Sequence, residues 1–120
     1  MLSFHLPAAV RVFLCTQPTD MRKSFDGLMG LVSSVLEQDP LSGHLFLFVN
    51  RRGDRIKILF WEQDGLCIYY KRLESGTFER LTSQADPQKR LELSTTDLAL
   101  LLQGVDISSA RRRKRYRHAS

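Results

Sequence analysis

Residues 42–78 contain three runs rich in β-branched, aromatic and aliphatic residues, separated by short polar turns. The turns are Arg-Gly-Asp at 52–54 and Gln-Asp-Gly at 63–65, and Glu-Ser-Gly at 74–76 follows the third run. Strand-forming runs joined by such glycine turns are typical of β-hairpins. The pattern predicts an antiparallel meander, and the rest of the chain must fold around that sheet.

The segment before the meander predicts one strand and one helix. Apolar residues at 10–14 predict the strand, and apolar residues at helical spacing from Phe25 predict the helix. Asp39-Pro40 is expected to end this helix, because the residue before a proline is disfavoured in helical backbone. Three residues carry an oxygen that is suited to cap the first turn: Thr19, Asp20 and Ser24.

The segment after the meander predicts two short strands, at 78–81 and 91–93, and a second helix. Ser94 and Asp97 have the spacing of a capping box at the start of this helix, and Gly104 suits its end. The order β-α-β-β-β-(β)-α predicts an α+β domain, with a mostly antiparallel sheet and both helices packed on one face.

Positive charge is concentrated near the C-terminus. The net charge is +5, and residues 111–117 hold six of the 18 Lys and Arg residues, which leaves 12 against 13 acidic residues elsewhere. No apolar periodicity appears after residue 107, so we expect a single domain at 1–107 and a disordered basic tail at 108–120. We favour nucleic acid as partner of the tail over an acidic protein or a solvated tail without specific use. Six phosphate contacts would give a slope of about −5 for log affinity against log salt. These cations are Arg111, Arg112, Arg113, Lys114, Arg115 and Arg117.

The meander also carries cations beside aromatic residues. Strand alternation allows Lys57, Trp61, Tyr69 and Lys71 to point outward together, where they would contact phosphates and stack on bases. The favoured alternative is that Trp61 and Tyr69 pack in the core or under a helix while the lysines lie at solvated edges. The meander residues that we consider as nucleic-acid contacts are Arg51, Arg52, Arg55, Lys57, Lys71 and Arg72.

Two smaller basic sites have competing interpretations. The arginines around the glycine turn at 50–55 would present guanidinium groups to phosphate, or form a solvated hairpin tip in which Asp54 pairs with an arginine. Arg22 and Lys23, before the first helix, would suit a phosphate-binding site at a helix N-terminus. Capping by the neighbouring Thr19 and Asp20 is the favoured interpretation there.

Composition and motifs argue against several functional classes. Carboxylates that might suggest a two-metal nuclease each have an ordinary role in a turn or at a helix start: Asp20, Asp26, Asp54, Glu62 and Asp64. No phosphate-binding or dinucleotide glycine motif is present, so we expect no enzymatic activity, metal, cofactor or small-molecule ligand. No segment is typical of a signal peptide or membrane span, and the two cysteines are expected to stay reduced, which favours a cytoplasmic protein.

Two blocks of sequence, residues 17–28 and 42–78, resemble the TnpB-type accessory protein of insertion-sequence family sixty-six. That protein is the product of the second reading frame and is distinct from the RNA-guided nuclease with the same label. The similarity includes Asn-Arg-Arg-Gly-Asp-Arg at 50–55 and Tyr-Lys-Arg-Leu-Glu at 70–74, and spans about residues 6–106. Ser24 stands where a glycine is expected, which affects only the entry to the helix.

The resemblance implies a bacterial mobile-element protein that assists transposition beside a separate, larger transposase. It implies no catalytic residues. Our first hypothesis is a non-catalytic accessory protein that binds element DNA non-specifically through the basic tail and hairpin. The alternative is a protein–protein adaptor that docks the transposase or other element-encoded proteins without contacting DNA.

Overall fold

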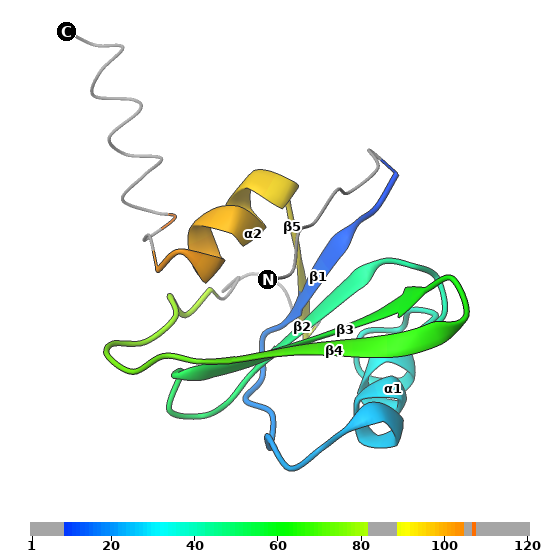
Figure 1. Ribbon diagram of the computed structural model, residues 1–120, viewed down its shortest axis with the longest axis horizontal. Helices are drawn as coiled ribbons and strands as arrows, with labels where there is room; N and C mark the ends of the chain where they lie inside the picture. Colours follow the sequence, from blue (N-terminus) through cyan, green and yellow to red (C-terminus); the bar gives the residue numbers. More distant parts are fainter. Residues whose placement is uncertain (1–8, 82–88, 105–106, 108–120) are drawn as a thin grey trace, which may run out of the picture.

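The computed structural model of the chain describes residues 9–81, 89–104 and 107, which form a five-stranded sheet and two helices (Figure 1). In chain order the elements are β1 (Val12–Cys15), α1 (Phe25–Ser34), β2 (Leu45–Val49), β3 (Arg55–Glu62), β4 (Gly65–Arg72), β5 (Arg90–Leu93) and α2 (Thr95–Leu102).

The strands lie in the order β4-β3-β2-β1-β5. β1 and β2 are parallel and are connected through α1, whereas the pairs β2–β3, β3–β4 and β1–β5 are antiparallel. The predicted α+β class, the mostly antiparallel sheet and the meander, formed by β2, β3 and β4, are confirmed.

The side chains of β1 alternate between two buried clusters, one on each face of the sheet. The cluster beneath α2 includes Val12, Leu14, Leu45, Leu47, Ile56, Ile58, Leu93, Leu98 and Leu101. The cluster beneath α1 consists of Phe13, Cys15, Leu28, Val32, Leu36, Phe46, Phe48 and Leu59. The two helices therefore lie on opposite sides of the sheet, as Figure 1 shows.

The prediction that both helices pack on one face is wrong. All four residues of β1 and the first four of β2 are buried, so each of these strands is apolar on both of its faces. A sheet with such strands at its centre must be covered on both sides. α1, within the crossover between the parallel strands, covers one face, and α2 covers the other.

Two predicted element boundaries also differ from the structure. α1 ends at Ser34 rather than near Asp39, because Glu37 takes a left-handed conformation with φ of 54° and the chain turns there. Residues 78–81 form no strand. Their backbone crosses the end of the sheet, where the Phe78 N–H donates to the Gly53 carbonyl at 2.8 Å instead of joining a ladder.

The two helices begin differently. Ser94 is the N-cap of α2, and its Oγ accepts a hydrogen bond from the Asp97 N–H at 3.0 Å, which confirms the predicted cap. Ser24 occupies the N-cap position of α1 but its side chain makes no capping hydrogen bond. α1 depends instead on its packing against the sheet through Leu28 and Val32, since a helix this short is marginal by itself.

This difference predicts unequal effects of two serine-to-alanine substitutions. Ser94→Ala removes the hydroxyl that accepts the Asp97 N–H and should lower the free energy of unfolding by about 1 kcal/mol. Ser24→Ala is the matched control and should change it by less than about 0.5 kcal/mol. Urea denaturation followed by far-ultraviolet circular dichroism measures both values. Equal losses in the two variants would contradict the capping assignment.

Candidate nucleic-acid interface

Three loops meet at the end of the sheet where the parallel strands β1 and β2 finish. They are the β1–α1 loop at 16–23, the β2–β3 turn at 50–54 and the segment at 77–81. The Thr19 N–H donates to the Val49 carbonyl at 2.8 Å, and Arg80 Nη2 donates to the Arg51 carbonyl at 3.1 Å. We call this region the tip surface. In sheets with parallel strands, ligands commonly bind at this end.

Side-chain hydrogen bonds from Asn50 hold the β2–β3 turn in one shape. Asn50 Oδ1 accepts from the Arg55 N–H at 3.0 Å, and Nδ2 donates to Asp54 Oδ1 at 2.7 Å. Gly53 completes the turn at φ +79°, a conformation that favours glycine, with its N–H bonded to the Asn50 carbonyl at 3.1 Å. The hydrogen bond from Asn50 is also the main cause of the lowered pKa of Asp54.

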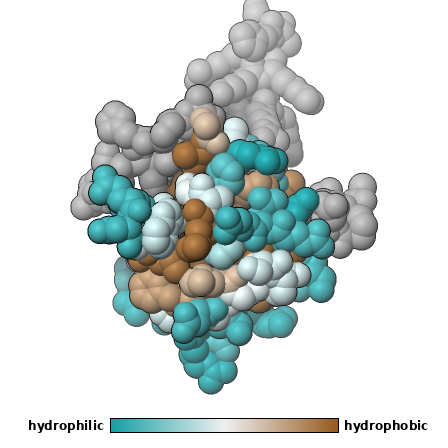
Figure 2. All heavy atoms as spheres, turned by 90° about the vertical axis from the view of Figure 1, so that its right-hand side faces the viewer, coloured by the Kyte–Doolittle hydropathy of each residue, from teal (hydrophilic) through white to brown (hydrophobic). Residues whose placement is uncertain are grey.

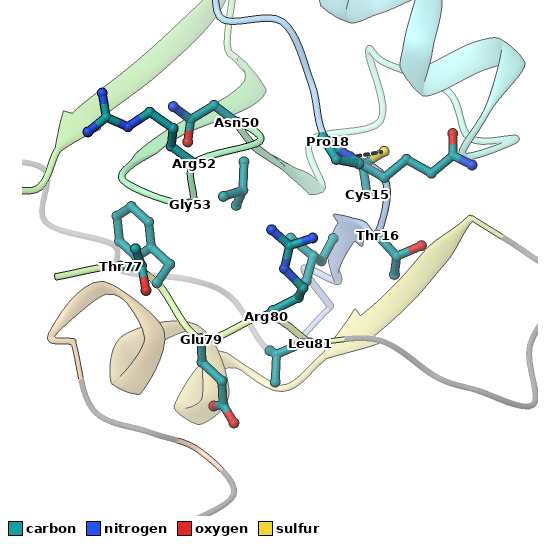
Figure 3. A pocket seen from close by; sticks show the side chains of 14 residues that line it. Cys15, Thr16, Pro18, Asn50, Arg52, Gly53, Thr77, Glu79, Arg80 and Leu81 are labelled. Atoms are coloured by element: carbon teal, nitrogen blue, oxygen red, sulfur yellow. Dashed lines mark hydrogen bonds between the residues drawn. The ribbon is translucent and has the colours of Figure 1, made fainter.

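The tip surface contains two adjoining hollows. The first, of about 200 Å³, has Leu14, Cys15 and Val49 among its lining and is bordered by polar groups of Thr16, Gln17, Asn50, Arg52, Thr77 and Arg80. Figure 3 shows the Arg80 side chain directed into this space, between Arg52 and Thr16. The second hollow, of about 480 Å³, lies between residues 18–21 and the turn, and includes Arg51, Arg52 and Arg55.

The carboxylates around the tip surface already have hydrogen-bond partners. Asp20 pairs with Arg22 at 2.7 Å, and Asp54 accepts from Asn50. Glu79 accepts from the Ile107 N–H at 2.6 Å, and Figure 3 shows its side chain turned away from the first hollow. Among the described residues the three salt bridges involve other arginines, so Arg51, Arg52 and Arg80 lack a carboxylate partner there. The alternative of an Asp54–arginine pair is not what the turn adopts.

The contacts of Arg22 do not favour a phosphate-binding site at Arg22 and Lys23. Arg22 donates from its backbone N–H, Nε and Nη2 to the Asp20 carboxylate, at 2.7 to 3.1 Å. These bonds lower the pKa of Asp20 to about 2. Arg22 is therefore neutralised by Asp20. The favoured prediction, that Asp20 caps the first turn of α1, is wrong, because its carboxylate bonds to Arg22 and Ser24 occupies the N-cap position.

The less favoured interpretation, in which Lys57, Trp61, Tyr69 and Lys71 share one outward surface, is contradicted by the strand register. The register places Lys57 opposite Tyr70 and Ile58 opposite Tyr69. Directly opposite residues point to the same face, so Lys57 and Trp61 lie on the α1 side while Tyr69 and Lys71 lie on the α2 side.

Both lysines hold backbone carbonyl groups inside the fold. Lys57 is only 8% exposed, and its Nζ donates to the carbonyls of Met21 and Lys23 at 2.8 and 2.7 Å. The same Nζ lies 4.7 Å from the centre of the Tyr70 ring. On the other face, Lys71 Nζ donates to the Leu102 carbonyl at the end of α2, at 2.8 Å. Neither ammonium group points toward solvent as a phosphate contact would require.

The other predicted contacts fall into three groups. Arg51 and Arg52 are exposed at the turn. Arg55 is half-buried, with Nη1 donating to Tyr70 Oη at 3.2 Å, and Arg72 forms an exposed pair with Glu74 at 3.1 Å. The predicted contacts of the tail, 111–117, lie outside the described residues, as does the boundary at 107–108.

Sequence reasoning missed Arg80 and the polar side chains that surround it. Arg80 lies in a segment that was expected to form a strand, and nothing local indicates that this segment passes beside the turn at 50–54. In the sequence, only the clustered arginines of the Arg-Gly-Asp turn indicated a basic surface here. The long-range contacts of Gly53 and Arg51 with 78–80 complete the surface.

Within the described part of the chain, no three His, Cys, Asp or Glu side chains gather as metal ligands would. In the same residues, neither helix has the length and apolar character needed to span a bilayer.

Comparison with known proteins identifies the family. The family model described as IS66 Orf2 like protein matches residues 10–112. The chain is 35% identical over 106 residues to the uncharacterized protein y4jC of Sinorhizobium fredii (strain NBRC 101917 / NGR234), covering 87% of this chain and 86% of the relative. It is 36% identical over 97 residues to the uncharacterized protein y4hO of the same strain, covering 81% and 82%. No solved structure gives a significant match.

The chain therefore belongs to the IS66 Orf2-like family. It is an insertion-sequence-associated accessory protein, as the resemblance implied. The two blocks that carried the resemblance contribute the β1–α1 loop and the β2–β3 turn, which form two of the three sides of the tip surface.

The contacts of Lys57 predict that it stabilises the fold. Lys57→Met keeps most of the side-chain volume but leaves two carbonyl groups without their donor, so we expect a loss of about 2 kcal/mol in the free energy of unfolding. Lys23→Met, at an exposed neighbouring position, should change it by less than about 0.5 kcal/mol. Urea denaturation tests both. A Lys57→Met variant with wild-type stability and weaker DNA binding would instead restore Lys57 as a contact.

The pKa of Asp20 predicts a contribution to stability that depends on pH. Its folded pKa of about 2 lies below the ordinary aspartate value of 3.8, so the ionised form stabilises the fold above about pH 4, and this contribution is lost as the pH falls towards 2. Asp20→Asn should therefore shift the urea midpoint at pH 7 but have a smaller effect near pH 2. In an Arg22→Gln background the shift at pH 7 should shrink. An undiminished shift there would show that Asp20 acts independently of Arg22.

Proposed function

We propose that this accessory protein binds duplex DNA without sequence preference, through the tip surface and the basic tail, and so keeps element DNA close to a separate transposase. The observation that carries the proposal is the group Arg51, Arg52 and Arg80, whose guanidinium groups lack carboxylate partners among the described residues. Guanidinium groups bind phosphate oxygens through paired N–H donors.

The tip surface and the tail have different roles in this proposal. The turn at 50–54 is held by Asn50 and by the backbone of 78–80, so its arginines project from a fixed frame. Because the turn backbone is already held, only the arginine side chains lose conformational freedom on binding. The six cations at 111–117 supply general affinity, as expected from charge alone. Arg55 and Arg72 remain secondary contacts, and Lys57 and Lys71 are left out of the set because their ammonium groups are bound within the fold.

A salt titration of duplex binding tests this proposal. Neutralising the six tail cations with glutamine should reduce the steepness of log affinity against log salt by about 5, and Arg52→Gln by roughly 0.9. Arg11→Gln is the matched control, because it removes one exposed charge at the opposite end of β1, where Arg11 pairs with Glu92. Arg11→Gln should leave the slope unchanged. Absence of binding at low salt would refute the proposal.

The adaptor function is the second candidate, supported by apolar side chains on the surface. Phe25, Leu41 and Tyr70 are 44%, 49% and 47% exposed. On the side of α1 and the β3–β4 turn, Figure 2 shows apolar atoms reaching the surface between hydrophilic residues. Exposed aromatic residues are common where proteins dock. Co-purification with the transposase after nuclease treatment distinguishes the two functions, since only direct docking survives removal of DNA.

A further inference from the structure

β4 has an exposed edge. Of the described strands it is last in the order β4-β3-β2-β1-β5, with β3 on one side only, and its eight residues are twice the length of the other edge strand, β5. The Leu73 N–H donates to the Asp54 carbonyl at 2.7 Å, which sets the alternation of the β3–β4 ladder. Because the backbone groups of Leu73 point toward β3, those of every second residue from Arg72 backwards point away from it. These residues are Leu66, Ile68, Tyr70 and Arg72.

The devices that usually protect an edge strand are largely missing from β4. It contains no proline, and its pairing with β3 runs through eight consecutive residue pairs without a bulge. Lys71 is the residue that would normally repel a neighbouring strand, but its ammonium is bound to the Leu102 carbonyl on the α2 face. The centre of the edge, 66–70, is apolar apart from the tyrosine hydroxyls, and Tyr70 is 47% exposed.

The charges at the two ends of β4 favour one occupant. Asp64 precedes the strand, and Arg72 ends it. In an antiparallel pair of identical strands related by a two-fold axis, each acidic end lies beside the basic end of the other copy. With Ile68 on the axis, Leu66 faces Tyr70 and Asp64 faces Arg72, twice each. The outward backbone groups of Ile68 are those that such a central pair requires.

We propose that β4 pairs with β4 of a second copy of this chain, centred on Ile68, so that the two sheets continue into one. The exposed pair of Arg72 with Glu74, whose side chains are 58% and 81% exposed, is readily exchanged for Asp64 of the second copy because exposed ion pairs contribute little. The dimer does not depend on DNA binding, and each copy keeps its tip surface.

Reciprocal charge reversal tests the dimer and its register. Sedimentation equilibrium of the full chain, after nuclease treatment, should show a concentration-dependent dimer. Asp64→Arg and Arg72→Asp each place like charges opposite one another and should raise the dimer dissociation constant at least about tenfold. The double variant Asp64→Arg/Arg72→Asp should return it to within about threefold of wild type. The matched control is Asp20→Arg/Arg22→Asp, an exposed pair away from β4, which should leave the constant unchanged.

Amide hydrogen exchange provides a second readout that does not depend on the substitutions. In the wild-type chain, protection of the Ile68 and Tyr70 amides should increase with protein concentration, whereas Tyr69, whose amide faces β3, should be protected throughout. A monomer at every concentration, or a dimer that neither charge reversal weakens, would overturn the proposal. Independence of the Ile68 amide from concentration would overturn it as well.

Discussion

The central constraint on this fold is that β1 and β2 are apolar on both of their faces. Every residue of Val12–Cys15 is buried, and Leu45 to Phe48 are buried as well. Such strands cannot lie on a sheet that is open to water on one side, because burying apolar surface contributes about 25 cal/mol per Å² and this surface is removed from water only by covering both faces. The parallel pairing of β1 and β2, the crossover through α1 and the placement of α2 on the other face all satisfy this one requirement.

When both faces are covered, backbone carbonyl groups near the helices need hydrogen-bond donors, and Lys57 and Lys71 supply them. The segment that leads into α1 crosses above β3, where its carbonyls at Met21 and Lys23 are out of reach of a strand partner, and Lys57 supplies the donors. Lys71 does the same for the end of α2 on the other face. A charged group costs free energy when it leaves water unless hydrogen bonds and nearby π electrons compensate, and here both are present for Lys57. The meander thus positions both helices through one cation on each side.

Local features of the chain were predictable, and long-range ones were not. The glycine turns and the Ser94 cap depend on residues close in sequence, so their patterns identified them. The burial of Lys57 depends on the register of β3 and β4 and on a segment more than thirty residues away, which no local pattern contains. The double-sided sheet had a signal, the unbroken apolar run of β2, although a strand of that length is also compatible with other buried elements. Arg80 had none.

The same contrast explains why net charge alone is a poor guide to the interface. Of the cations in the described residues, several are already bound by the fold: Lys57 and Lys71 by carbonyl groups, Arg90 by the Leu36 carbonyl, and Arg11 by Glu92. Arg51 and Arg52 at the tip surface keep their guanidinium groups available because Asp54 accepts its hydrogen bond from Asn50 rather than from an arginine, whereas Arg80 donates one N–H to the Arg51 carbonyl. The availability of these two guanidinium groups therefore depends in part on the Asn50 amide. A chain with the same composition but with an Asp54–arginine pair would carry the same net charge and present a weaker field to phosphate.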